Sequence, residues 1–463
     1  MPVHVPPRPP RTQGSKIVDG FGVERRLRGV CIGGWLNMEN FVTGYSANES
    51  MMRAEVRKAI GDELADRFYE RLLTAFFGED DAKFLGDNGF DLVRIPLNYR
   101  HLEHDDKPFE IIEDGFRHLD RAIEALGRNG VYSIIDLHAL PGYQNHHWHS
   151  DNPTHIASFW EHPHFQERVI NIWKAIATRY RGNVWVAGYN LMNEPADESR
   201  AVVGPLYHRL FEVVREIDPD HTVYLDGNTY STEFDMFDDV PLPNTIYSLH
   251  DYVAAGLGRG GDYPGETDGV FIDREVARRK FLERSEYARR TGTPIVVGEF
   301  APIYTGDERV DAMRRQILED QLDLYREYDV SWTSWMYKDL GRQGLVSVAP
   351  ETAYRRRFDG FVEKKNRLGA DQWGSTGEGV AEVTRPVQDL IAAEFPDFDP
   401  YPWGRFDWVR TLLLNITIAQ PLAQEYAALF RGLDGEQLDA LADSFAFRNC
   451  VVRDTLLDQL KRG

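Results

Sequence analysis

The sequence of 463 residues predicts an α/β protein, a closed (β/α)₈ TIM barrel that carries a C-terminal helical extension. The first observation behind this prediction is that short runs rich in β-branched residues alternate with longer amphipathic runs, as in parallel strands joined by helices. The second is that eight such strands can be placed along the chain, and eight is the number that closes this barrel.

Each expected strand is a short stretch in which aliphatic and aromatic residues predominate, and most of them end on a polar side chain. In chain order the strands are Leu27–Trp35, Phe90–Asn98, Val131–Ala139, Val186–Glu194, Thr222–Asn228, Thr245–Tyr252, Pro294–Phe300 and Val330–Asp339. The C-terminal ends of all strands meet at one face of such a barrel, so we expect these polar side chains to gather there.

Between the strands, apolar residues recur three and four positions apart, as on one face of a helix. Helices are therefore expected at Gly115–Arg128, Phe165–Tyr180, Gly204–Ile217, Asp273–Arg290 and Val310–Tyr328. A further helical segment, Met51–Phe77, interrupts the long loop after the first strand. The glycine-rich loop Val253–Gly269 lacks the pattern of a phosphate-binding loop, and we expect it to shape or gate a substrate pocket.

The chain divides into a proline-rich N-terminal arm (1–26), the barrel (27–396) and the C-terminal helical extension (397–463). The extension follows a link rich in proline and aromatic residues and contains two helical regions, Phe406–Phe430 and Gly435–Leu460. Pro421 is expected to kink or split the first region. Three roles for the extension remain open: packing on the barrel, covering a loop, or forming a homo-oligomer.

The net charge of −21 repels phosphate backbones and anionic lipid surfaces, so neither nucleic acid nor a membrane is expected as a partner. The chain has no run of about 18 apolar residues, the length that would predict a transmembrane helix. Its two cysteines, Cys31 and Cys450, do not form a disulfide framework. The N-terminus lacks the apolar stretch of a secretory signal, so we expect a cytoplasmic protein.

Two glutamates at the ends of different strands suggest the chemistry. Glu194 ends a strand in the sequence Asn-Glu-Pro, and Glu299 ends another in the sequence Gly-Glu-Phe. Acid-assisted displacement at a sugar carbon needs two carboxyl groups, one to protonate the leaving oxygen and one to attack or to activate water. An alternative explanation is that strand ends are polar only because strands end at the surface. That explanation accounts for Asp or Ser at these positions more readily than for Arg, His, Glu and Trp.

Seven motifs in order, each on its own expected strand, resemble those of glycoside hydrolase family 5, whose members are retaining β-glycosidases on (β/α)₈ barrels. The resemblance covers residues 25–340. Its motifs are Arg28-Gly-Val-Cys-Ile-Gly-Gly-Trp35, Val93-Arg-Ile-Pro96, Asp136-Leu-His138, Leu191-Met-Asn-Glu-Pro195, Leu249-His-Asp-Tyr252, Gly298-Glu-Phe300 and Trp335.

The resemblance implies that Glu194 is the general acid/base and Glu299 the nucleophile. Arg94 would then hold Glu299 ionised, and Tyr252 would donate a hydrogen bond to the same carboxylate. Asn193 would bind the sugar 2-hydroxyl, whose hydrogen bond strengthens in the transition state.

The remaining candidates surround the sugar. His138 and His250 would bind sugar hydroxyls or tune Glu194, and Trp335 would form the floor under the reacting ring. Asn145 ends the segment His138–Asn145, which resembles the corresponding loop of exo-acting β-1,3-glucanases, and Trp148 follows in His146–His149, where the sequence departs from the usual residues of those enzymes. Glu39 occupies the position at which those exo-acting members carry a glutamate that grips the non-reducing-end sugar.

The sequence therefore predicts a retaining β-glycosidase that needs no cofactor or metal and hydrolyses β-glucosides or short β-linked oligosaccharides from the non-reducing end by double displacement. An endo-acting β-glucanase or β-mannanase is one alternative, and a non-catalytic carbohydrate-binding barrel is another. A metal-dependent hydrolase that uses His146, His147 and His149 is a third, although their spacing matches no zinc motif.

Overall fold

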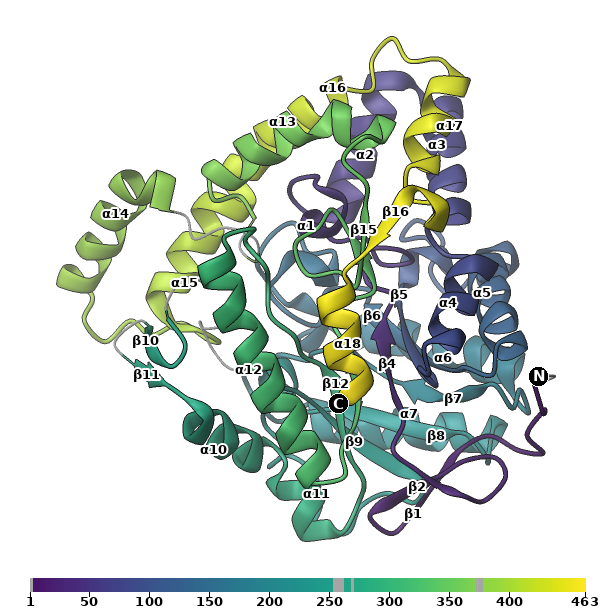
Figure 1. Cartoon of the computed structure of the whole chain (residues 1–463). Helices are drawn as coiled ribbons and strands as arrows, with labels where there is room; N and C mark the ends of the chain where they lie inside the picture. Colours follow the sequence, from purple (N-terminus) through teal and green to yellow (C-terminus); the bar gives the residue numbers. More distant parts are fainter. Residues whose placement is uncertain (1–2, 253–261, 268–269, 372, 374–377) are drawn as a thin grey trace.

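The computed structural model describes residues 3–252, 262–267, 270–371, 373 and 378–463 and contains the expected closed barrel (Figure 1). Eight parallel strands close in the order β12-β13-β4-β5-β6-β7-β8-β9. They are β4 (Arg28–Cys31), β5 (Leu92–Asn98), β6 (Tyr132–Ala139), β7 (Val186–Asn190), β8 (Thr222–Asp226), β9 (Thr245–His250), β12 (Ile295–Glu299) and β13 (Ser331–Ser334). All eight fall within the expected runs, so the predicted fold class is confirmed.

Helices surround the barrel, and several lie in the long loop between β4 and β5. They are α2 (Glu49–Ile60), α3 (Asp62–Phe76), α4 (Glu79–Asp87), α5 (Arg117–Arg128), α6 (Pro163–Tyr180), α7 (Val203–Ile217), α10 (Arg274–Arg284), α11 (Glu286–Thr291) and α12 (Glu308–Glu327). The expected helix Met51–Phe77 is divided at Gly61, whose φ of +82° is a conformation that favours glycine. The expected helix Asp273–Arg290 is likewise divided at Ser285.

Three small sheets accompany the barrel. The N-terminal arm contains β1 (Arg11–Gln13), β2 (Lys16–Val18) and β3 (Glu24–Arg25), which pair antiparallel. The strands β10 (Gly265–Thr267) and β11 (Val270–Ile272) form a hairpin. The expected gating loop Val253–Gly269 lies largely outside the described residues. The third sheet joins β14 (Lys338–Asp339) and β15 (Val346–Val348) to β16 (Cys450–Val452), a strand of the extension.

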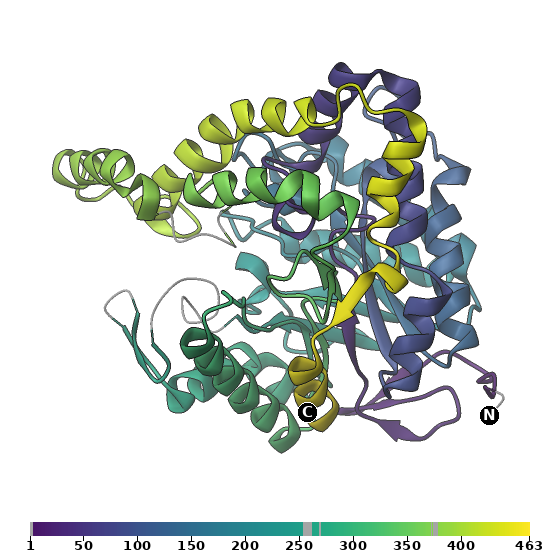
Figure 2. The ribbon, with the colours of Figure 1, turned by 45° about the horizontal axis from the view of Figure 1, so that its top comes forward.

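Further helices follow the barrel strands: the green and yellow-green ones extend over one end of the barrel, whereas the yellow ones at the end of the chain run down its side (Figure 2). They are α13 (Ala353–Arg367), α14 (Ala381–Glu394), α15 (Gly404–Arg410), α16 (Ala419–Ala428), α17 (Gly435–Asp443) and α18 (Asp454–Arg462). The predicted break at Pro421 is wrong in position. The irregularity lies before it, in a π-helical segment (Thr411–Ile418). A π-helical turn is wider than an α-helical turn. Pro421 can therefore lie in the first turn of α16, directly after this segment, without ending the helix.

Hydrophobic and polar contacts fix the extension to the barrel. Phe430 packs on Phe68 and Phe445 packs on Phe76, with ring centroids 4.9 and 5.6 Å apart. The fully buried ammonium group of Lys338 donates to the carbonyl oxygen of Phe445 at 2.8 Å and to the Asp81 carboxylate at 2.7 Å. Within the described part of the chain, no helix is long and apolar enough to cross a membrane.

Candidate active site

A cavity of about 350 Å³ opens at the C-terminal ends of the barrel strands. The residues predicted from the sequence that line it are Glu39, His138, Trp148, Glu194, His250, Tyr252, Glu299 and Trp335. The other three, Arg94, Asn193 and Asn145, are almost fully buried and lie beneath the cavity lining. Six of these eight lie in or just after the expected strands, whereas Glu39 and Trp148 lie in loops.

Glu299, at the end of β12, is held by two donors. The guanidinium of Arg94 donates to one carboxylate oxygen at 2.7 Å, and the hydroxyl of Tyr252 donates to the other at 3.0 Å. Burial, together with the charge of Glu299, raises the pKa of Tyr252 well above its usual value, so this hydroxyl keeps its proton. Both carboxylate oxygens of Glu299 are therefore hydrogen-bonded.

Cys31, at the end of β4, lies beneath this carboxylate. Its thiol is fully buried and donates to the carbonyl oxygen of Gly298 at 3.4 Å. Burial raises the pKa of the thiol to about 12. Cys31 and Cys450 are not joined to each other.

Glu194 lies in the loop after β7, in a left-handed backbone conformation with φ +46°. Such strain in a residue other than glycine is concentrated at functional sites. His250 Nδ1 lies 2.6 Å from one carboxylate oxygen of Glu194, and His149 Nε2 lies 3.0 Å from the other. Burial alone would raise the pKa of Glu194, but the His250 cation and the two imidazole hydrogen bonds outweigh it, so the pKa is lowered.

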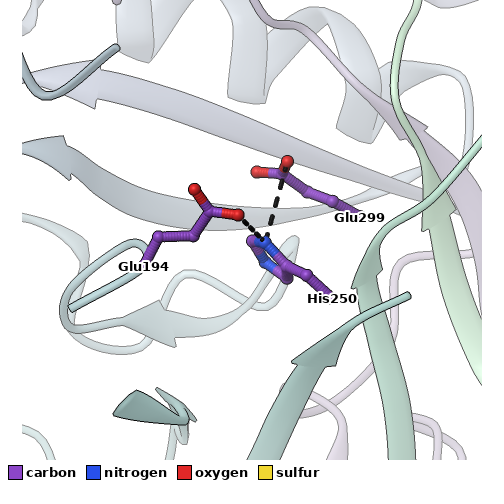
Figure 3. A group of neighbouring side chains, drawn as sticks. All are labelled: Glu194, His250 and Glu299. Atoms are coloured by element: carbon purple, nitrogen blue, oxygen red, sulfur yellow. Dashed lines mark hydrogen bonds and ion pairs between the residues drawn. The ribbon is translucent and has the colours of Figure 1, made fainter. Parts of the chain in front are cut away.

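His250 connects the two carboxylates, as Figure 3 shows. Its Nδ1 is 3.7 Å from an oxygen of Glu299. Burial lowers the pKa of His250, but the charges of Glu299, Asp226 and Glu194 prevail and raise it to about 9. One oxygen of Glu194, one of Glu299 and a nitrogen of His250 all lie within 4.8 Å of one another.

Within the described residues, this triplet is also the only cluster of His, Cys, Asp and Glu side chains compact enough to hold a metal ion. It does not include His146, His147 or His149, the residues of the predicted metal alternative. His149 instead contacts Glu194, and His147 packs against Tyr230 with ring centroids 5.1 Å apart.

The floor of the cavity is made by Trp335 and His138, whose rings stack at 5.5 Å and 11°. Asp136 binds His138 Nδ1 at 2.7 Å, while burial lowers the pKa of His138 well below its usual value. The ring is therefore neutral. Gly33 allows the close approach of Trp335, because a Cβ atom there would lie 2.6 Å from the indole ring.

Asn193 connects His138 to Arg94, which binds Glu299. Its carbonyl oxygen accepts from Arg94 at 2.7 Å, and its amide nitrogen lies 3.3 Å from His138 Nε2. Asn193 is fully buried in this network, so its position is fixed before any ligand arrives.

Glu39 is a buried carboxyl group at the edge of the cavity. Its Oε1 lies 3.6 Å from His138 Nε2 and has no hydrogen-bond partner among the residues that the structure describes. Burial, together with the charges of Glu299 and Glu194, raises the pKa of Glu39 well above its usual value. A buried polar atom without a partner in a cavity wall indicates a group that a ligand satisfies.

The two predicted loop residues have different surroundings. Asn145 donates to the backbone carbonyl of Glu194 at 3.1 Å and contacts His149 Nε2 at 2.9 Å, so it braces the loop from behind. Trp148 lines the cavity.

The sequence analysis missed several lining residues, namely Phe41, Tyr230, Thr232, Arg284, Trp373, Trp403 and Asp407. Tyr230 follows β8 closely, so the rule for strand ends could have identified it. Trp373, Trp403 and Asp407 lie after the barrel strands, where no strand end marks them.

A barrel with two buried carboxyl groups at the ends of β7 and β12, one held by arginine and tyrosine and the other by imidazoles, defines an O-glycosyl hydrolase. The family model described as "Cellulase (glycosyl hydrolase family 5)" matches residues 74–341. The chain belongs to glycosyl hydrolase family 5.

Curated relatives extend this comparison. A protein named β-xylosidase from Phanerodontia chrysosporium is 41% identical over 460 residues, which cover 96% of each chain. Endoglucanase C of Acetivibrio thermocellus is 25% identical over 59% of this chain and 87% of its own. A probable glucan 1,3-β-glucosidase A of Aspergillus fumigatus is 27% identical over 69% of this chain and 84% of its own.

Solved structures share the fold. A hyperthermophilic endo-β-1,4-glucanase in complex with substrate has a TM-score of 0.51 and 19% sequence identity, over 69% of this chain and 91% of its own.

Proposed function

We propose that this enzyme is a retaining, exo-acting β-glycosidase that releases the terminal sugar of β-xylosides or β-glucosides by double displacement. The observation that carries this proposal is the closeness of the two carboxyl groups, since one oxygen of Glu194 lies within 4.8 Å of one oxygen of Glu299. Retaining enzymes hold their two carboxyl groups about 5–5.5 Å apart, whereas inverting enzymes separate them by about 6.5–9.5 Å to admit a water molecule.

In the first step Glu299 attacks the anomeric carbon while Glu194 gives a proton to the leaving oxygen, and a covalent glycosyl-Glu299 ester forms. His250, 2.6 Å from Glu194, supplies the proton that Glu194 passes on. In the second step Glu194 takes a proton from water, the water oxygen attacks the anomeric carbon, and Glu299 leaves. Two inversions return the β-configuration.

The shape of the cavity supports exo action. At about 350 Å³, the cavity lies at the small end of ligand sites, which suits a short substrate better than a polymer strand. Glu39 offers an unpartnered carboxyl oxygen to a terminal sugar. An endo-acting glucanase, the activity in the name of the Acetivibrio relative, needs a cleft that a chain can cross.

The choice of sugar follows from the comparisons. The similarity to the protein named β-xylosidase covers 96% of the chain and so includes most of the extension. The family model ends at residue 341, before the extension begins. We therefore place β-xylosides first among the substrates to test and β-glucosides second.

The test is the anomer that forms first. Hydrolysis of an aryl β-xyloside or β-glucoside, followed by proton NMR before mutarotation, should release the β-anomer, and early α-anomer would overturn retention. Glu299→Gly should lose hydrolysis by roughly 10⁴-fold or more but couple an α-glycosyl fluoride to an acceptor. An oligosaccharide labelled at its reducing end should shorten by one unit at a time, whereas internal cuts would identify an endo-acting enzyme.

A further inference from the structure

The chain after the last barrel strand contributes side chains to the cavity that holds the two glutamates, and two of them, Trp403 and Asp407, belong to the C-terminal extension. Trp373, Trp403 and Asp407 all line this cavity. Trp373 packs edge-on against Tyr252 with ring centroids 4.8 Å apart, and Trp403 packs against Tyr230 at 5.2 Å. The cavity wall is therefore completed by residues that follow the last barrel strand.

These two tryptophans lie near different carboxylates. Tyr252 donates to Glu299, so Trp373 is on the side of the nucleophile. Trp403 is on the side of Glu194. It packs against Tyr230, whose ring centroid lies 6.0 Å from that of His149, and His149 contacts Glu194. The leaving oxygen must lie beside Glu194, the group that protonates it, so Trp403 and Tyr230 are on the side from which the leaving group departs.

The backbone that carries Tyr230 is strained. Thr229, Tyr230 and Ser231 have φ values of +50°, +59° and +62°, a left-handed run that is rare for residues other than glycine. The hydroxyl of Ser231 donates to the carbonyl oxygen of Ser248 at 2.7 Å and holds this turn. The hydroxyls of Thr229 and Tyr401 lie 3.0 Å apart, which ties the turn to the extension.

Polar groups without partners lie in the same wall. His147 Nε2 and Trp148 Nε1 have no hydrogen-bond partner among the described residues, and both side chains are more than nine-tenths buried. The carboxylate of Asp407 lies 3.9 Å from His147 Nε2. A pyranose ring presents a flat C–H face and an edge of hydroxyl groups, and this wall offers an aromatic face beside polar atoms.

We propose that Trp403 and Tyr230, with His147 and Asp407 beside them, form the site for the sugar unit that leaves, so that the extension selects the leaving group. This inference rests on the proposed double displacement. The same site would hold an acceptor sugar when the glycosyl-Glu299 ester is transferred to a sugar instead of water.

The experiment starts from that ester, prepared with a 2-deoxy-2-fluoro-β-glycosyl fluoride whose leaving group is too small to use the site. Recovery of activity is then measured in buffer, with methanol, and with the corresponding free sugar as acceptor. In Trp403→Ala the ratio of sugar-dependent to water-dependent recovery should fall by at least about tenfold. The methanol-to-water ratio should stay at the wild-type value, because methanol has no ring to stack.

Two further variants test the same proposal if Trp403→Ala folds poorly. Trp403→Leu fills space without an aromatic ring and should behave like Trp403→Ala, whereas Trp403→Phe should retain most of the transfer to sugar. Trp408, in the helix that begins directly after Trp403, packs on Phe398 outside the cavity lining, so Trp408→Ala should match the wild type.

A wild-type sugar-to-water ratio in both Trp403→Ala and Trp403→Leu would overturn the proposed leaving-group site alone. Absence of the fluorosugar ester from wild-type protein, judged by intact mass, would overturn double displacement and the leaving-group site with it.

Discussion

At the residue scale, the two glutamates differ because their neighbours differ. Glu299 is bound by a guanidinium and a phenol hydroxyl, whereas Glu194 is bound by two imidazoles. Between the lowered pKa of Glu194 and the pKa of about 9 for His250, the Glu194–His250 pair carries one proton, which rests on the imidazole. In the proposed double displacement, this is the proton that the leaving oxygen receives.

The pair predicts a limit to activity at alkaline pH. Above about pH 9 the His250 imidazolium loses its proton, so kcat/KM should fall as the pH rises through that value. In His250→Asn the cation is gone, burial raises the pKa of Glu194, and Glu194 itself must hold the proton. The alkaline limb should then move below pH 9, and the rate should fall by about 10²–10⁴-fold.

The measurement is a pH profile of kcat/KM on an alkyl glycoside, whose leaving oxygen needs a proton. A dinitrophenyl glycoside serves as the control, because its leaving group departs unprotonated and its rate should be affected far less. An alkaline limb that stays at the same pH in His250→Asn would refute this account of the proton.

The sequence predicted both glutamates and Tyr252 because each lies at or just after a strand end, and it predicted Arg94 within a strand from the motif Val93-Arg-Ile-Pro96. It did not predict that His149 contacts Glu194. That contact depends on how the loop after β6 folds back, braced by Asn145, and strand periodicity carries no information about it.

At the element scale, strands were easier to predict than the joints between elements. The strands are apolar on both faces, and such a run can be recognised in the sequence whatever elements lie beside it. The division of helices at Gly61 and Ser285, and the π-helical segment before Pro421, depend on local backbone geometry that helical periodicity does not encode. The position of the extension on the barrel depends on Lys338, whose hydrogen-bond partners are far away in sequence.

Lys338, in β14, joins three elements through its contacts with Phe76, Asp81 and Phe445. Lys338→Met should lower the free energy of unfolding by about 3–5 kcal/mol, because it leaves the Asp81 carboxylate buried without its cation. Denaturant unfolding would measure this loss. Lys83→Met removes an exposed lysine paired with Asp87 and should cost under about 1 kcal/mol.

The double variant Lys338→Met with Asp81→Asn should recover part of the stability, since no charge then remains buried. A loss of less than about 1 kcal/mol in Lys338→Met alone would contradict the view that this ion pair anchors the extension.

At the scale of the whole molecule, one hydrophobic core runs from the barrel helices into the extension. Phe358 packs on Phe430, which also packs on Phe68. The bidentate pairs Arg67–Asp439 and Arg71–Asp443 hold α17 along α3. Composition and periodicity identified the helices of the extension, but they left its position open because its contacts with α3 join residues hundreds of positions apart.

The buried thiol of Cys31 contacts the backbone next to Glu299, so its rate of alkylation can report ligand binding. Cys31 has a pKa of about 12 and no exposed surface, so at pH 8 an alkylating reagent reaches it only when the barrel opens. A sugar that binds only the folded form slows that opening reaction by a factor of 1 + [L]/Kd. In Cys450→Ser, a ligand at about 100 times its Kd should slow alkylation about 100-fold.

Mass spectrometry of the alkylated protein would follow this reaction without any turnover. Labelling of Cys31 that is fast and indifferent to every sugar would show that the floor of the barrel opens independently of the cavity above it. Where a sugar protects Cys31, the half-time of Cys31 alkylation ranks candidate sugars in a catalytically inactive variant. Sugar binding is then measured separately from bond cleavage.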